Sequence, residues 1–381
     1  MDSIIIIGTG LAGYSLAREF RRLDQITPLL IITEDDGRSY SKPMLSNALA
    51  QGKDDAKLTL ADAEAMAQTL QAQILTHTQV TGIDSHNRTV FTRQGSHTYS
   101  SLVFAMGARP IRLPIKGDGA EDVLSVNNLG DYAHFREKLE QAQGIAIIGP
   151  GLIGCEFAND LLQVNKAVTL IGPDPYPIST LLPESAGTAL QSALQKTGVG
   201  WRLGSVVDQI DKLPNGYRLL LSNGDQLEAD LVLSAVGLRP NIGLAAETGI
   251  ATNRGIVTDR NLQTSMARVY ALGDCAEVDG LNLPYVAPLM IGARALAKTL
   301  AGTPTAVEYP AMPVVIKTPA CPIVAAPPPR SAEGAWEISA DQDNVTALFR
   351  SADGQLQGFV LTGTAVSQKQ ALTKQLPALL A

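Results

Sequence analysis

The stretch Met1–Gly13, MDSIIIIGTGLAG, decides how the first part of this chain folds. Ile4–Ile7 is a run of β-branched residues, which predicts a strand buried on both faces of a sheet. Glycines with the spacing G-x-G-x-x-G follow directly, and Tyr14–Leu23 has the pattern of an amphipathic helix. The stretch therefore predicts a strand, a tight turn and a helix in immediate succession.

The three glycines of this turn have separate physical roles. Gly8 allows the tight turn, Gly10 lets a pyrophosphate approach the backbone, and Gly13 lets the helix pack closely on the strand. The free N–H groups and the positive dipole end of the helix then face the phosphate. After a second apolar strand at Leu29–Ile32 comes Glu34, where a carboxylate would hold ribose hydroxyls. We therefore predict a dinucleotide-binding unit.

The same pattern recurs in the middle of the chain. Ile145–Ile148 predicts a strand, Cys155–Leu162 a helix and Val168–Ile171 a second strand. The glycines between the first strand and the helix are Gly149, Gly151 and Gly154. Two such units predict two bound dinucleotides, and the alternative is a duplicated fold in which one site no longer binds.

Length and composition limit the class of protein. A chain of 381 residues suits two or three domains, and 45% hydrophobic with 18% charged residues is a globular composition. The net charge of −7 argues against nucleic acid as a partner. The sequence has no apolar run of membrane-spanning length and no signal-peptide pattern, so we expect a cytoplasmic protein that does not interact with membranes.

The number and spacing of the cysteines and histidines do not indicate structural disulfides or a metal site. Three cysteines that are far apart cannot form a disulfide framework. The four histidines show no ligand spacing, so we assign no metal site. They are His77, His86, His97 and His134.

Three further segments each place a glycine after an apolar strand. They are FAMGARP at Phe104–Pro110, SAVGLRPN at Ser234–Asn241 and YALGDCAE at Tyr270–Glu277. Together with the two glycine motifs, and in this order, they resemble the FAD-dependent pyridine nucleotide oxidoreductases of the glutathione reductase type. The resemblance covers nearly the whole chain.

This resemblance implies an α/β fold with two Rossmann-like domains, in which the NAD(P)H domain interrupts the FAD domain. A small α+β domain follows at the C-terminus, with strands expected at 335–338, 345–350 and 357–361, and we expect it to pack on the first domain. The expected domains are 1–110 and 241–312 for FAD, 111–240 for NAD(P)H, and 313–381 for the C-terminal domain.

The resemblance also implies which residues contact the cofactors. Asp274 would bond the ribityl chain of FAD; the alternative role, as the N-cap of a helix after Gly273, is compatible with it. Arg109 and Arg239 are expected to tie loops or cofactor edges. The predicted cofactor-binding residues are Gly8, Gly10, Leu11, Ala12, Gly13, Glu34, Lys42, Pro43, Val80, Ala105, Met106, Gly107, Arg109, Gly149, Gly151, Leu152, Ile153, Gly154, Glu156, Gly237, Gly273, Asp274, Val286 and Lys317.

Two of these residues are predicted to be catalytic. Glu156 matches the glutamate that the family places beside the nicotinamide. Lys42 is the candidate for its ionic partner near flavin N5, where a cation favours the reduced flavin. The alternatives are a solvated Lys42 and a Glu156 that serves only the first turn of its helix.

The absence of particular cysteines indicates the subfamily. Disulfide reductases need a C-x₄-C or C-x₂-C pair, and the family's peroxidases and oxidases use a cysteine in the loop equivalent to Tyr40–Asn47, which has none here. Electrons would therefore leave FAD singly for an external carrier. The tetrapeptide Tyr40–Pro43, YSKP, resembles the Y-x-K-P form of rubredoxin and flavorubredoxin reductases, and Val315–Pro319 also looks like the rubredoxin reductase form.

We therefore predict transfer of hydride from NAD(P)H to FAD and of single electrons to rubredoxin. The nearest alternative is a ferredoxin or flavorubredoxin reductase, although ferredoxin reductases usually carry lysine where this chain has Asn47. An NAD(P)H oxidase or peroxidase and a non-enzymatic redox sensor are further alternatives. Both a monomer and a homodimer are compatible with the sequence.

The preferred nicotinamide and the docking surface are indicated weakly. Gly172-Pro173-Asp174 follows the second strand of the second unit, so the acid expected for NADH is displaced, and no arginine for a 2′-phosphate stands there. Asp174 favours NADH and leaves NADPH possible. Because rubredoxins are typically acidic and this chain is too, we predict a small, mainly apolar docking patch at the flavin edge with a few lysines or arginines.

Overall fold

A seven-stranded sheet forms the first dinucleotide-binding unit in the computed structural model, which describes residues 3–381. The predicted first strand is β1 (Ser3–Ile7), whose four isoleucines are buried because helices and loops cover both faces of the sheet. It runs parallel to β2 (Leu29–Ile32) and β8 (Gly95–Phe104). The strand β19 (Val269–Ala271) pairs with β8, so the chain returns to this sheet after the second unit.

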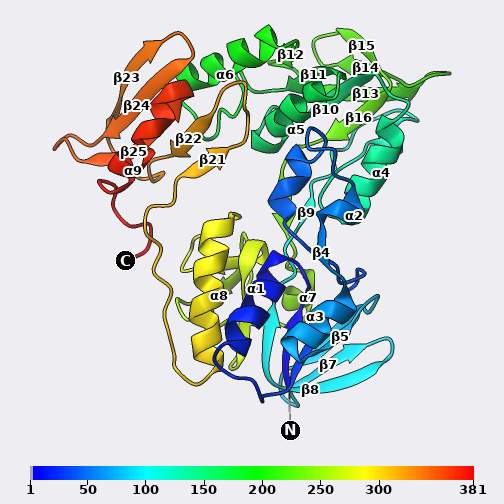
Figure 1. Cartoon of the computed structure of the whole chain (residues 1–381), viewed down its shortest axis with the longest axis vertical. Coiled ribbons are helices and arrows are strands. Elements are labelled where there is room, and N and C mark those ends of the chain that lie inside the picture. Colours follow the sequence, from blue (N-terminus) through cyan, green and yellow to red (C-terminus); the bar gives the residue numbers. More distant parts are fainter. Residues whose placement is uncertain (1–2) are drawn as a thin grey trace.

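Two helices far apart in the sequence lie side by side in this unit (Figure 1). They are α1 (Leu11–Arg21) and α8 (Val286–Leu300). Shorter elements complete the unit and its flanks: α3 (Ala63–Leu70), β5 (Gln73–Leu75), β6 (Val80–Asp84), β7 (Thr89–Thr92), α7 (Gly243–Glu247), β18 (Ile256–Thr258), η3 (Gly273–Cys275) and β20 (Ala276–Val278).

The second unit repeats this plan with a four-stranded parallel sheet in the order β12-β11-β10-β16. The strand β10 (Gly144–Ile148) leads into α5 (Leu152–Gln163), as β1 leads into α1. A three-stranded antiparallel sheet, β13-β14-β15, adjoins it. The remaining elements are η2 (Ala120–Asp122), α4 (Leu129–Leu139), β11 (Ala167–Gly172), α6 (Glu184–Lys196), β12 (Gly200–Leu203), β13 (Val207–Lys212), β14 (Tyr217–Leu221), β15 (Gln226–Ala229) and β16 (Leu231–Ser234).

Two connections tie the units together. One is the two-stranded ribbon of β9 (Ala108–Pro110) and β17 (Leu238–Pro240). The other is the segment 42–58, which leaves the first unit and buries Leu45, Leu49 and Leu58 in the core of the second. It contains η1 (Lys42–Asn47) and α2 (Asp55–Leu58), and it is flanked by β3 (Ser39–Tyr40) and β4 (Thr59–Ala61), which pair with each other.

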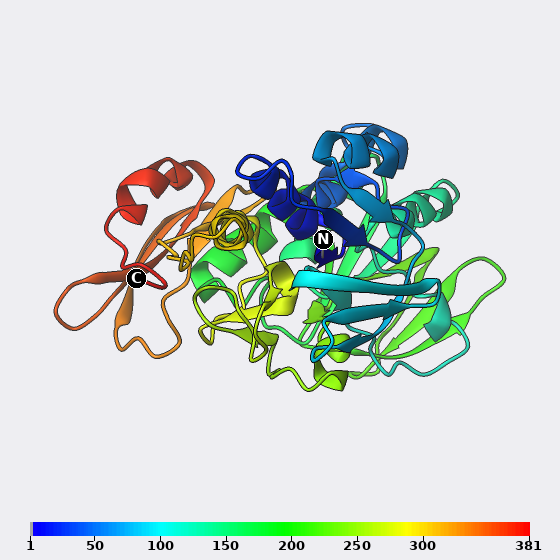
Figure 2. The same ribbon diagram turned by 90° about the horizontal axis from the view of Figure 1, so that it is seen from below.

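The C-terminal domain is a five-stranded antiparallel sheet that packs on the second unit, so the predicted packing on the first domain is wrong. Val345 and Val360 share a hydrophobic core with Leu190 and Leu194, because α6 packs against this sheet (Figures 1 and 2). The elements are β21 (Val314–Ile316), β22 (Ile323–Ala326), β23 (Ala335–Asp341), β24 (Asn344–Arg350), β25 (Leu356–Thr362), η4 (Gly363–Gln368) and α9 (Lys369–Thr373).

The helices that follow the two glycine motifs start earlier than expected, by the same number of residues. The helices α1 and α5 begin at Leu11 and Leu152, three residues before the predicted starts, because Gly10 and Gly151 already occupy the N-cap position. None of the helices within residues 3–381 is both long enough and apolar enough to cross a membrane.

Candidate active site

The first glycine turn has the shape that a dinucleotide phosphate requires. A side chain at Gly8, where φ is +112°, would place its Cβ 2.4 Å from the carbonyl oxygen of Ala105. A Cβ at Gly13 would lie 2.0 Å from the carbonyl oxygen of Gly8. A Cβ at Gly10 would meet no atom within 4 Å, so the backbone there is open to a ligand.

The second glycine turn repeats this geometry. Gly149, with φ of +109°, would bring a Cβ to 2.6 Å from the carbonyl oxygen of Ala235, and Gly154 to 2.0 Å from that of Gly149. Gly151 is again open. Leu152 and Ile153 form the first turn of α5, whose N–H groups point toward this opening. Both turns thus fit a dinucleotide, and the predicted Gly237 follows β16 at the same edge of the sheet.

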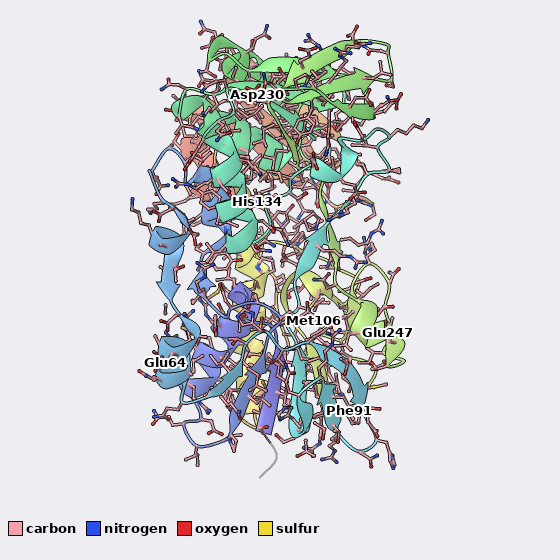
Figure 3. All side chains as sticks on the ribbon, turned by 90° about the vertical axis from the view of Figure 1, so that its right-hand side faces the viewer. Glu64, Phe91, Met106, His134, Asp230 and Glu247 are labelled. Atoms are coloured by element: carbon pink, nitrogen blue, oxygen red, sulfur yellow. The ribbon has the colours of Figure 1, made fainter. Side chains whose placement is uncertain are left out.

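The other predicted FAD residues of the first unit gather around Gly8. Ala105, Met106 and Gly107 follow the end of β8, and the N–H of Ala105 bonds the carbonyl of Ile7. Gly273, with φ of +80°, lies so close to Ala12 that an added Cβ would stand 2.8 Å away. Figure 3 shows Met106 at mid-height, between the sheet that carries Phe91 and the domain that carries Asp230.

The predicted cofactor-binding residues farther along the chain from Gly8 lie in two kinds of place. Val80 begins β6 two residues after Thr78, whose N–H bonds Thr33 at the end of β2, and Val286 begins α8. Arg109 instead lies exposed on the β9–β17 ribbon, directly opposite Arg239.

A carboxylate that bonds the first glycine turn is Asp35, which the sequence analysis missed. Its Oδ1 atom accepts hydrogen bonds from the Thr9 hydroxyl at 2.9 Å and from the Thr33 hydroxyl at 2.7 Å. Thr9 lies between Gly8 and Gly10. Glu34 and Asp35 are both exposed, but the side chain of Glu34 makes neither of these bonds. A signal was present, because two further acids follow Glu34 directly.

Glu156 is the centre of a buried polar cluster that joins three segments. Its side chain is 0% exposed. Its Oε2 atom accepts a hydrogen bond from the Ser46 hydroxyl at 2.5 Å and lies 3.1 Å from Nζ of Lys317. Its Oε1 atom accepts a bond from the backbone N–H of Lys317 at 2.9 Å. The Lys317 ammonium also bonds the carbonyl of Pro43.

The predicted ion pair between Lys42 and Glu156 is therefore wrong, because Lys317 supplies the cation. The η1 side chain that bonds Glu156 is that of Ser46, whereas Lys42 lies near Asp274 and Asp131. Burial lowers the pKa of Lys42, and the nearby charge of Asp274 opposes that effect. Burial likewise raises the pKa of Asp274, with Lys42 opposing.

The expected alternative role of Asp274 as a helix cap does not occur. The N-cap residue of η3 is Leu272, and that of α8 is Tyr285. The side chain of Asp274 therefore remains available beside Gly273.

All three cysteines are free and buried, which disfavours thiol chemistry. Burial raises the pKa of both Cys275 and Cys321 to about 11, and raises that of Cys155 further. A thiol needs to ionise to exchange with a disulfide or attack a substrate.

Comparisons with known proteins agree with this geometry. The model of the pyridine nucleotide-disulphide oxidoreductase family matches residues 2–302, and that of the rubredoxin-binding C-terminal domain matches residues 306–376. The rubredoxin-NAD(+) reductase of Alcanivorax borkumensis is 50% identical over 381 residues, covering 100% of both chains.

Two further proteins extend the comparison. The nitric oxide reductase FlRd-NAD(+) reductase of Aeromonas salmonicida is 39% identical, covering 98% of this chain and 96% of the relative. The solved ferredoxin reductase of Rhodopseudomonas palustris has the same fold, with a TM-score of 0.89 at 23% identity over 99% of this chain and 96% of its own. The chain belongs to the pyridine nucleotide-disulphide oxidoreductase family, in the branch that carries a rubredoxin-binding C-terminal domain.

Proposed function

We propose that the protein is a cytoplasmic rubredoxin reductase that uses NADH and FAD. When bound, FAD supplies the conversion of one hydride into two single electrons. The observation that carries the proposal is the contact of Lys317 with Glu156. It places a residue of the segment matched by the rubredoxin-binding domain against the helix that follows the second glycine turn.

The residues of the chain would bind and orient the cofactors. The turn at Gly8–Gly13 would hold the pyrophosphate of FAD, Asp35 or Glu34 its adenosine ribose, and Asp274 its ribityl chain. The turn at Gly149–Gly154 would hold NADH. We also propose the remaining cofactor contacts predicted from the sequence. The proposed domains are 1–110 and 241–312 for FAD, 111–240 for NADH, and 313–381 for the C-terminal domain.

The buried cluster would set the electrostatics beside the nicotinamide. Lys317 and Ser46 together hold the carboxylate of Glu156 in one orientation, since each of its oxygens accepts a bond. Lys42, the first residue of η1, would add a positive charge near Asp274. Fixed charges of this kind need no reorganisation during the reaction.

A comparison of electron acceptors tests the proposal. NADH oxidation by the FAD-loaded protein would be followed with rubredoxin, with a [2Fe–2S] ferredoxin and with oxygen alone, then repeated with NADPH. We expect rapid turnover with rubredoxin only, and faster turnover with NADH than with NADPH. Equal turnover with oxygen alone would refute the proposal.

Flavorubredoxin is a second candidate acceptor. The similarity to the reductase of Aeromonas salmonicida favours it, and the chemistry at the site would be the same. Adding the rubredoxin domain of a flavorubredoxin as a fourth acceptor distinguishes the two. A higher kcat/KM with that domain would make it the physiological partner.

A further inference from the structure

Helix α5 buries three polar side chains on one face. Glu156, Asn159 and Asp160 are 0%, 4% and 2% exposed. Their spacing of three and four residues places them on the same side of the helix. Acidic residues are almost never fully buried without partners, and a buried amide without hydrogen bonds is also unfavourable, so each of these side chains requires an explanation. All three find their partners in segments outside the second unit.

Asp160 holds the end of the η1 segment through two backbone groups. Its Oδ2 atom accepts a hydrogen bond from the N–H of Leu49 at 2.9 Å, and its Oδ1 atom one from the N–H of Ala50 at 3.0 Å. Bonds that a carboxylate accepts from N–H groups are among the stronger ones in proteins. Leu49 lies three residues after Ser46, so the position of Ser46 depends on this anchor.

Asn159 holds the C-terminal segment in the same way. Its Oδ1 atom accepts a hydrogen bond from the N–H of Ala320 at 3.2 Å, three residues after Lys317. The two anchored segments also touch each other, because Nζ of Lys317 lies 3.2 Å from the Ser46 hydroxyl and Nδ2 of Asn47 lies 3.4 Å from the carbonyl oxygen of Lys317. The three segments therefore form a closed ring of contacts.

We propose that Asp160 and Asn159 are positioning residues, which fix residues 46–50 and 317–320 on α5 so that Ser46 and Lys317 reach Glu156. The proposal rests on the proposed function, since it concerns the same reaction centre. Neither residue needs to touch cofactor or substrate. Small displacements of reacting groups slow chemistry strongly, so we expect flavin reduction by NADH to slow about tenfold when Asp160 loses one of its bonds.

The test compares D160N with D230N in the FAD-loaded protein. Asn has one acceptor oxygen and one donor group, so it can keep only one of the two bonds at position 160. D230N is the control for the loss of charge alone, because Oδ2 of Asp230 accepts both of its bonds, from the N–H groups of Gln143 and Gly144 at 2.7 and 2.8 Å within the second unit, and the amide oxygen of Asn can keep both.

Amide hydrogen exchange distinguishes a positioning role from a purely local structural one, because a local role would change exchange only next to the substituted residue. In D160N we expect faster exchange in residues 46–50 and also in 317–320, which Asp160 does not touch, whereas D230N leaves both unchanged. Faster exchange in 46–50 alone, or flavin reduction equal to that of D230N, would overturn the proposal. N159L tests the other anchor with the same measurements and replaces D160N if that variant does not fold. We expect faster exchange in residues 317–320 and also in 46–50, and slower flavin reduction.

The same experiment separates the two proposals. If the wild-type flavin is reduced by NADH and rubredoxin reoxidises it, the proposed function stands whatever the variants do. If wild-type flavin is not reduced by NADH, the proposed function fails, while the exchange data still decide whether the anchors are coupled.

Discussion

The ammonium of Lys317 lies 3.1 Å from Oε2 of Glu156, although the two residues are 161 positions apart and belong to different domains. Glu156 is fully buried and the Lys317 side chain is 35% exposed. Removing one partner of a buried pair leaves an uncompensated charge. The pair therefore links the packing of the C-terminal domain to the electrostatics of the site.

The first prediction is that K317M destabilises the holoenzyme and slows flavin reduction. We expect a loss of about 2–3 kcal/mol in the free energy of unfolding, because Glu156 loses its countercharge. Lys196 provides a control, since it pairs with Asp343 of the C-terminal domain at 2.9 Å with its side chain 63% exposed. K196M should cost at most about 1 kcal/mol and leave flavin reduction unchanged. Chemical denaturation and stopped-flow bleaching by NADH measure both effects, and equal losses in the two variants would contradict the prediction.

The second prediction concerns the acid that holds the adenosine ribose of FAD. Since Asp35 accepts hydrogen bonds from Thr9 within the glycine turn and from Thr33, and Glu34 makes neither bond, D35N should weaken FAD binding more than E34Q. Hydrogen bonds to a charged group contribute about 1.5–3 kcal/mol, which corresponds to roughly tenfold or more in Kd. Fluorescence titration of the flavin-free variants with FAD measures the difference. A larger effect of E34Q would restore Glu34 to the role predicted from the sequence.

Alkylation tests the absence of thiol chemistry. Because burial raises the pKa of Cys275 and Cys321 to about 11, roughly one thiol in a thousand would be ionised at pH 8. We expect iodoacetamide to leave NADH-dependent electron transfer intact at pH 8, and any labelling to increase as the pH rises toward 11. Denatured protein, in which all three cysteines react, is the control. Rapid inactivation at pH 8 with labelling of one cysteine would contradict a thiol-independent mechanism.

The repeated glycine motifs made the fold predictable because their physics is local. A buried strand, a turn that only glycine permits and a helix N-terminus lie within a dozen residues, and both units follow that plan. The strand at Leu29–Ile32 matches β2 residue for residue. The strands β21 and β22 were missed, because Pro319 and Pro322 between them look like loop sequence.

The composition of the active site was less predictable, because its contacts are long-range. No local pattern indicates that Ser46 and Lys317 meet at Glu156, and the family pattern led to Lys42 instead. A usable signal did exist in α5, where Glu156, Asn159 and Asp160 interrupt an apolar helix on one face. Similarly, the packing of the C-terminal sheet depends on which apolar face of another domain remains uncovered, and the sequence of the sheet does not contain that information.

The fourth prediction is that D174A shifts the preference from NADH toward NADPH. The pairs Ile148↔Ile171 and Ile7↔Ile32 are equivalent in the two sheets, so Asp174 occupies the position that Asp35 has in the first unit. Its carboxylate is held by the hydroxyl of Ser179. A carboxylate there would repel a 2′-phosphate, so its removal should raise the ratio of kcat/KM for NADPH to that for NADH by about tenfold. S179A serves as the companion variant, with a smaller shift in the same direction, and an unchanged ratio in D174A would exclude Asp174 from the ribose site.

The last prediction concerns the docking surface. Val315 is 50% exposed and lies two residues before Lys317, in the segment matched by the rubredoxin-binding domain. A charge there should disrupt an apolar contact, so V315D should raise KM for rubredoxin about tenfold while flavin reduction by NADH stays unchanged. I26D is the control, because Ile26 is 92% exposed in the loop before β2, at the opposite end of that strand from the glycine turn. If the contact is mainly apolar, kcat/KM with rubredoxin should not fall between low and moderate salt, since the net charges of two acidic proteins oppose their encounter and added salt screens that repulsion. A steep fall with added salt would instead indicate that lysines and arginines dominate the interface.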